Sequence, residues 1–141
     1  NTLALACLCP PWATIYCSPV AHIQEDECNA PEFFTGGAKL NLVGSDDKLT
    51  PAALEQAILG TAQGDVHGPQ RGPVSLTQIT EKGRIYALSE LSEPHSYTSL
   101  LLNVGRYQPD SSSRVFSLPG SSHLTPSGHE RHASSCFVCF P

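Results

Sequence analysis

The sequence lacks methionine, has only three lysines and carries few charged side chains of either sign. Charged residues make up 15% of the 141 positions, against about 25% in an average globular protein. A net charge of −5 with so few lysines leaves no basic patch, which argues against nucleic acid and anionic membranes as partners. No apolar run approaches the ~20 residues that span a bilayer, so we expect no membrane span.

The composition also disfavours a helical bundle. The 11 glycines and 12 prolines favour a domain of strands and turns instead. The length predicts a single domain over residues 1–141. We expect residues 7–107 and 136–139 to form its folded part, and the Ser-, Pro- and Gly-rich segment 108–135 to be irregular.

Cysteine is missing from the whole middle of the chain. An even count of six, without the paired C-x-x-C spacing of a zinc ribbon, predicts disulfides and export. A bridge between the two ends would remove roughly 4.7 kcal/mol of unfolded-state freedom, as for a loop of about 100 residues. We therefore predict a secreted, extracellular protein with at least one such bridge, whose pairing stays open; reduced thiols in a cytosolic protein are the alternative. The six predicted disulfide cysteines are Cys7, Cys9, Cys17, Cys28, Cys136 and Cys139.

Capping and turn residues predict one helix among several strands. Thr50 as N-cap, a proline at the first helical position and Gly60 after the end predict a helix over Pro51–Leu59. This helix is too short to persist alone, so its apolar stripe must pack on a sheet or a barrel end. Apolar alternation between turn signals predicts extended segments at residues 15–23, 38–43, 74–79, 84–91 and 97–104.

The cysteine spacing and one strand resemble a known family. The opening Cys7-x-Cys9-x7-Cys17, with Tyr16 directly before the third cysteine, resembles the start of netrin-like domains. That family includes the N-terminal domain of tissue inhibitors of metalloproteinases. Segment 83–88 is similar to the family's G-x-x-Y-L-L strand.

The closing Cys136-x-x-Cys139 also looks like the terminal cysteine cluster of that family. The resemblance implies a mainly β fold: a small OB-like five-stranded barrel with one or two short helices and disulfide-stapled termini. In the inhibitors, the first cysteine is N-terminal and chelates the zinc of the protease. Residues 1–6 precede Cys7 here, so we expect no inhibition by this route.

No stretch of the chain carries a catalytic signature. It has no G-x-S-x-G elbow, and the acidic groups at 25–27 and 46–47 lack EF-hand spacing, so we interpret both as solvated turns. His123, His129 and His132 are residues of a type that binds zinc or copper, but their spacing matches no recognised site. We interpret them as part of a solvated tail, and we expect no catalytic residue, no metal, no cofactor and no enzymatic activity.

An aromatic and proline-rich ridge follows the first cysteine pair, formed by Pro10, Pro11, Trp12, Ile15 and Tyr16. Trp12 either closes one end of the core or belongs to a protein-binding edge, because tryptophan is common in both settings. We predict a secreted, non-catalytic binding module of netrin-like type that contacts other extracellular proteins through this ridge, such as a protease or a matrix partner. The alternative is a structural or assembly subunit of an extracellular matrix or a large secreted complex.

Overall fold

The computed structural model describes residues 1–87, 89–90, 116–117 and 135–139 of the chain. Their strands form one sheet in the order β2-β1-β3-β5-β4. Strands β2, β1 and β3 are parallel, whereas β5 runs antiparallel to both β3 and β4. The strands are β1 (Thr14–Cys17), β2 (Lys39–Leu42), β3 (Val74–Gln78), β4 (Phe116–Ser117) and β5 (Ser135–Cys139).

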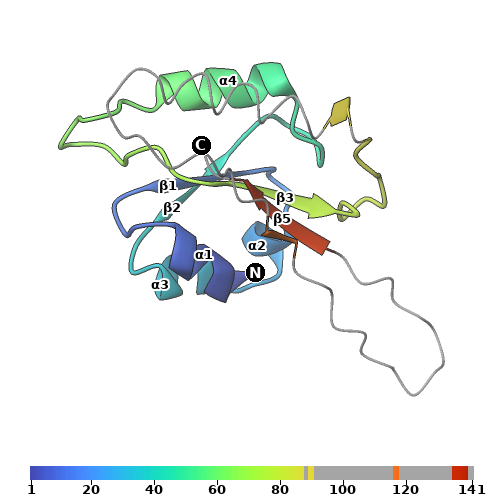
Figure 1. Cartoon of the computed structure of the whole chain (residues 1–141), viewed down its shortest axis with the longest axis horizontal. Coiled ribbons are helices and arrows are strands. Elements are labelled where there is room, and N and C mark those ends of the chain that lie inside the picture. The colour runs from blue at the N-terminus through green and yellow to red at the C-terminus, as the bar shows by residue number, and fades with distance from the viewer. Residues whose placement is uncertain (88, 91–115, 118–134, 140–141) are drawn as a thin grey trace.

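Helices cover both faces of the parallel strands, which gives a three-layer α/β arrangement (Figure 1). Three short helices lie on one face and α4 lies on the other. The helices are α1 (Thr2–Leu8), α2 (His22–Glu25), α3 (Ala30–Phe34) and α4 (Pro51–Gly60). None of the helices within the described residues has the length and apolarity to cross a membrane.

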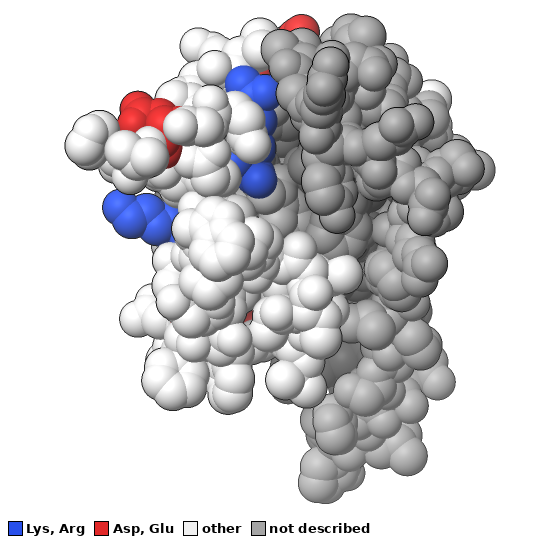
Figure 2. Space-filling model, turned by 60° about the vertical axis from the view of Figure 1, so that its left-hand side comes forward, with Lys and Arg blue, Asp and Glu red and all other residues white. Residues whose placement is uncertain are grey.

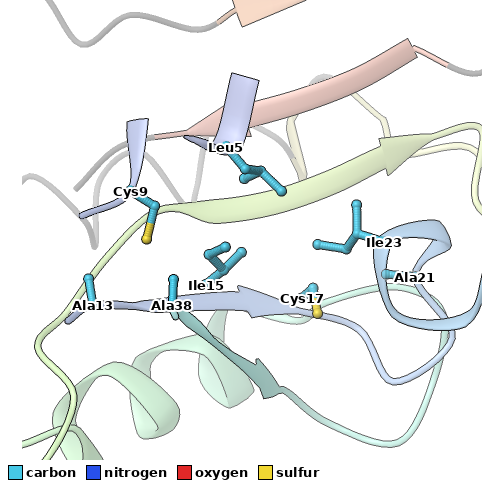
Figure 3. Close-up of a cluster of buried hydrophobic side chains, with 8 residues drawn as sticks. All are labelled: Leu5, Cys9, Ala13, Ile15, Cys17, Ala21, Ile23 and Ala38. Atoms are coloured by element: carbon cyan, nitrogen blue, oxygen red, sulfur yellow. The ribbon is translucent and has the colours of Figure 1, made fainter. Parts of the chain in front are cut away.

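Strand β1 is buried at all four positions, as expected for a central strand covered by helices on both sides. Its side chains alternate between two cores. Ile15 and Cys17 enter the core beneath α1 and α2, whereas Tyr16 enters the core beneath α4. Figure 3 shows the first of these cores, which comprises Leu5, Cys9, Ala13, Ile15, Cys17, Ala21, Ile23 and Ala38.

Helix α4 confirms the predicted helix and its packing. The Thr50 side chain accepts a hydrogen bond from the Ala53 backbone N–H at 3.3 Å, which caps the first turn. Leu54 and Ile58 are buried, one turn apart, and fix the helix on the sheet. The core on this face comprises Tyr16, Val43, Leu49, Leu54, Ile58, Val74, Leu76 and Tyr86.

The predicted OB-like barrel is wrong. A strand with a parallel neighbour on each side needs crossover connections, and these place helices over both faces rather than closing an antiparallel meander. Alternation of apolar residues correctly indicates strands at 38–43 and 74–79, but it does not reveal whether neighbouring strands run parallel or antiparallel.

Three of the predicted extended segments contain strands. Segments 38–43 and 74–79 hold β2 and β3, but the segment at 15–23 ends its strand at Cys17 and then forms the turn before α2. Residues 84–87 are not a strand, and residues 89–90 are helical, so the prediction for 84–91 is wrong. The segment at 97–104 and nearly all of 108–135 lie outside the described residues.

The predicted disulfide staple is also wrong, because all four cysteines of the first cluster are free. Burial raises the pKa of Cys9 to about 11, and burial together with the Glu32 carboxylate raises the pKa of Cys17 to about 12. These two thiols therefore stay protonated and pack as small apolar side chains in the core. Cys7 and Cys28 are exposed.

Candidate active site

The topology singles out the carboxyl edge of the parallel strands. The chain passes from β1 to β2 through α2 and α3 on one face, and from β2 to β3 through α4 on the other face. The chain moves from β1 outward to β2 and then returns past β1 to β3, so the direction of winding reverses between β1 and β3. Open α/β sheets bind ligands outside the carboxyl ends of their strands at such a switch point. The candidate site is therefore expected at the turns that follow β1 and β3.

Those two turns bring a histidine and three carboxylates together. His22 starts α2 after β1, and its Nδ1 lies 3.5 Å from Oε1 of Glu81, which follows β3. The same nitrogen lies 3.5 Å from Oδ2 of Asp26, and Nε2 lies 3.8 Å from Oε1 of Glu27. The His22 side chain is 42% exposed, so a ligand can reach it. We call these four residues the carboxyl-edge cluster.

Glu27 is the most firmly held carboxylate of the cluster. The Asn1 side-chain amide donates to its Oε1 at 2.9 Å, and the Thr2 hydroxyl donates to its Oε2. These bonds tie the start of α1 to the loop that carries His22. The cluster thus combines one fixed carboxylate with the more exposed carboxylates of Asp26 and Glu81.

The cluster is suited to proton transfer. A carboxylate beside one ring nitrogen orients an imidazole and selects its tautomer. Here Asp26 and Glu81 lie beside Nδ1, whereas Nε2 lies 3.8 Å from Glu27 Oε1, beyond hydrogen-bonding distance, and can accept a proton. Atoms of His22, Asp26 and Glu81 also lie within 4.8 Å of one another and could hold a metal ion. Nitrogen and oxygen donors of this kind suit divalent cations.

Sequence reasoning missed this cluster. It interpreted residues 25–27 as a solvated turn and gave His22 and Glu81 no functional role. The residues come from two turns that are far apart in the sequence, and no local motif links them. The signal that finds them is topological: both turns follow neighbouring parallel strands.

A second charged group secures the turn that carries Glu81. Asp47 follows β2 and is only 1% exposed, and it accepts hydrogen bonds from the Arg84 guanidinium and the Thr80 hydroxyl. The Arg84 hydrogen bond holds the pKa of Asp47 well below its usual range. Arg84 also lies 2.6 Å from Oδ2 of Asp46. The expectation of a fully solvated turn is therefore wrong for Asp47, which links the loops after β2 and β3.

Only part of the predicted protein-binding ridge lies on the surface. Pro10, Pro11 and Trp12 are exposed, whereas Ile15 and Tyr16 are completely buried in the two cores. Trp12 is 67% exposed, so it does not close the core. It lies at the amino edge of the sheet, just before β1. Figure 2 brings this side of the molecule forward, and its described surface is mostly uncharged. A protein-binding role for Trp12 stays a prediction.

The other residues named from the sequence lie away from the cluster or outside the described residues. Strand β5 places Cys136 opposite Thr77 and Cys139 opposite Val74 on β3. The three histidines of the tail fall outside the described residues, namely His123, His129 and His132.

A family comparison agrees with this architecture. The model of the Beta-eliminating lyase family matches residues 1–99, which is more than half of the 141 residues. The chain belongs to the Beta-eliminating lyase family. The match includes all three parallel strands and every residue of the carboxyl-edge cluster.

Two curated relatives are low specificity L-threonine aldolases. The protein from Pseudomonas aeruginosa is 46% identical over 92 residues, and the one from Pseudomonas sp. is 44% identical over 92 residues. Each alignment covers 64% of this chain but only 26% of the relative. The solved structure of Leishmania major threonine aldolase matches 72% of this chain and 29% of its own, with a TM-score of 0.65 and 24% identity. That likeness shows a shared fold.

These findings correct the functional predictions. The netrin-like resemblance is wrong, and with it the non-catalytic, extracellular binding module and the matrix subunit, because the chain belongs to a family of lyases. The prediction of secretion is also wrong: it rested on disulfides, and the first four cysteines are free. The expectation that the protein is not an enzyme is contradicted by its threonine aldolase relatives.

Proposed function

We propose that this chain forms one wall of the active site of a lyase that cleaves β-hydroxy amino acids of the L-threonine type. The family match and the two aldolase relatives support this substrate class. The observation that carries the proposal is the carboxyl-edge cluster at the switch point between β1 and β3. Because the chain spans 26% of those relatives, we assign it a wall rather than the complete site.

The chemistry of such a cleavage needs a base. When the bond between Cα and Cβ of a β-hydroxy amino acid breaks, the β-hydroxyl loses its proton and becomes an aldehyde oxygen. A positioned side chain that accepts this proton contributes typically about 10²–10⁴-fold to the rate. In our proposal Nε2 of His22 accepts it, while the Asp26 and Glu81 carboxylates beside Nδ1 hold the imidazole in position.

A cofactor is implied beside this wall. The family and the threonine aldolase likeness point to a fold-type I enzyme that uses pyridoxal phosphate (PLP). This group serves as an electron sink for carbanions, and in its enzymes a lysine amine holds it through a Schiff base. Whether this chain can anchor PLP therefore depends on where its lysines lie and on what their amines contact.

A hybrid enzyme tests the proposed function. In the P. aeruginosa aldolase, the 92 aligned residues are replaced by those of this chain, and aldehyde release from L-threonine is measured. We expect the hybrid to cleave L-threonine and His22→Ala to lower kcat at least about 10²-fold. His67→Ala is the matched control, because His67 is exposed in the loop before β3, away from the cluster, and should leave kcat unchanged. Full activity of a folded His22→Ala hybrid would refute the role of His22.

A further inference from the structure

We infer that this chain supplies the imidazole and carboxylate wall of a PLP site but not the amine that anchors PLP, which comes from a lysine outside these 141 residues. The inference rests on the proposed function, because it asks what that site needs. All three lysines of the chain lie within the described residues: Lys39, Lys48 and Lys82.

An anchoring lysine needs a free amine beside the site. A lysine amine becomes nucleophilic when it is desolvated in an apolar pocket or placed next to another cation. It must also reach the carboxyl edge, where His22 and Glu81 meet. None of the three lysines meets both conditions.

Lys48 is fully engaged as a cation. Its Nζ lies 2.6 and 2.8 Å from the two carboxylate oxygens of Glu90 and 3.1 Å from the Ile85 carbonyl oxygen. The same Nζ sits 4.9 Å from the centroid of the Tyr86 ring. All three ammonium protons thus have acceptors, and the aromatic face adds a cation–π contact. These contacts engage the amine, so it is not free to attack an aldehyde.

Lys39 lies at the wrong end of its strand. It is the first residue of β2, where it pairs with Thr14 at the start of β1, whereas Leu42 pairs with Cys17 at the carboxyl end. Three residues of strand separate these two ends by about 10 Å. Its side chain is also exposed on an outer strand of the parallel group, so nothing desolvates its amine.

Lys82 directly follows Glu81 in the sequence, but its amine pairs with a different residue. Its Nζ lies 3.5 Å from Oδ1 of Asp46, and its side chain is 55% exposed. Asp46 also binds Arg84 at 2.6 Å, so a carboxylate lies between the two cations. An exposed ammonium paired with a carboxylate is neither desolvated nor free.

Borohydride trapping tests the inference directly. The 141-residue chain is incubated with equimolar PLP and reduced with sodium borohydride, and labelled peptides are mapped by mass spectrometry. We expect sparse labelling that follows exposure, with Lys39 and Lys82 labelled more than Lys48. Stoichiometric labelling of any one of the three lysines would overturn the inference.

The same trapping in the hybrid aldolase separates this inference from the proposed function. We expect one stoichiometric label on a lysine outside the transplanted residues. A label on Lys39, Lys48 or Lys82 in the hybrid would overturn the inference even if the hybrid cleaves L-threonine. A correctly labelled hybrid that fails to cleave L-threonine would refute the proposed function and leave the inference intact.

Discussion

The two edges of the parallel sheet differ in chemistry. The carboxyl edge gathers His22, Asp26, Glu27 and Glu81, and its buried Asp47 is matched by charged and polar partners. The amino edge instead exposes apolar groups, with Trp12 before β1, Phe33 before β2 and Val66 before β3. One edge therefore gathers groups that can move protons, whereas the other exposes large apolar side chains alongside Lys39 and His67.

Under the proposed function, an exposed aromatic is a weaker guide to the active site than topology is. Trp12 and its neighbouring prolines attract attention in the sequence, yet they lie at the edge opposite to the histidine. Exposed apolar residues mark surfaces that other chain segments or partners cover. Chemistry in a parallel α/β sheet is expected at the carboxyl ends of its strands.

The largest disruption is expected at the amino edge, where the segment before β3 approaches β1 closely. A Cβ at Gly72 would lie 2.2 Å from the Thr14 carbonyl oxygen, and the neighbouring Pro73 carbonyl accepts from the Tyr16 N–H at 2.9 Å. Gly72→Ala should therefore lower the free energy of unfolding by about 3 kcal/mol, because backbone must move. Urea denaturation measures the effect.

Gly68→Ala is the matched control for this variant, because a Cβ there meets nothing within 4 Å. Equal stability of the two alanine variants would show that the approach of the two segments is not tight, and that the amino edge tolerates rearrangement.

The next largest effect is expected at the carboxyl edge. Asp47→Asn removes the charge that Arg84 and Thr80 contact and should cost about 1.5–3 kcal/mol. Because the folded pKa of Asp47 is lowered, its contribution is present above the ordinary carboxyl pKa and is lost as the pH falls below about 4. Thermal melts of wild type and Asp47→Asn should therefore converge in acid, and a constant difference across that range would contradict the ion pair.

The smallest effect on stability is expected for Trp12→Ala. Its side chain is 67% exposed, so the free energy of unfolding should change by no more than about 0.5 kcal/mol. A loss of about 3–5 kcal/mol would instead place Trp12 in the core. If Trp12 is a binding hot spot, the same variant should weaken association with its partner by about 2 kcal/mol, as measured by calorimetry.

Local signals in the sequence predict local structure well. The cap at Thr50 and the proline after it specify where α4 begins, and alternation marks the positions of β2 and β3. These features depend on residues close in sequence. The orientation of β1 between two parallel partners does not, because it is decided by the crossovers that pack helices on each face.

The same distinction explains the errors at the site. The cysteines looked like a disulfide framework, but Cys9 and Cys17 serve as core residues, a role that spacing cannot distinguish from a bridge. The contact between His22 and Glu81 joins turns after two different strands, so it becomes visible only once the strand order is known.

A double-mutant cycle in the hybrid aldolase tests the central claim that these two turns form one active-site wall. The cycle combines His22→Ala and Glu81→Gln and measures kcat/KM for L-threonine cleavage. Because His22 Nδ1 lies 3.5 Å from Glu81 Oε1, the account predicts a coupling of about 0.5–3 kcal/mol between the two losses in activation free energy. Losses that add within about 0.3 kcal/mol, or a Glu81→Gln hybrid with unchanged kcat/KM, would contradict it.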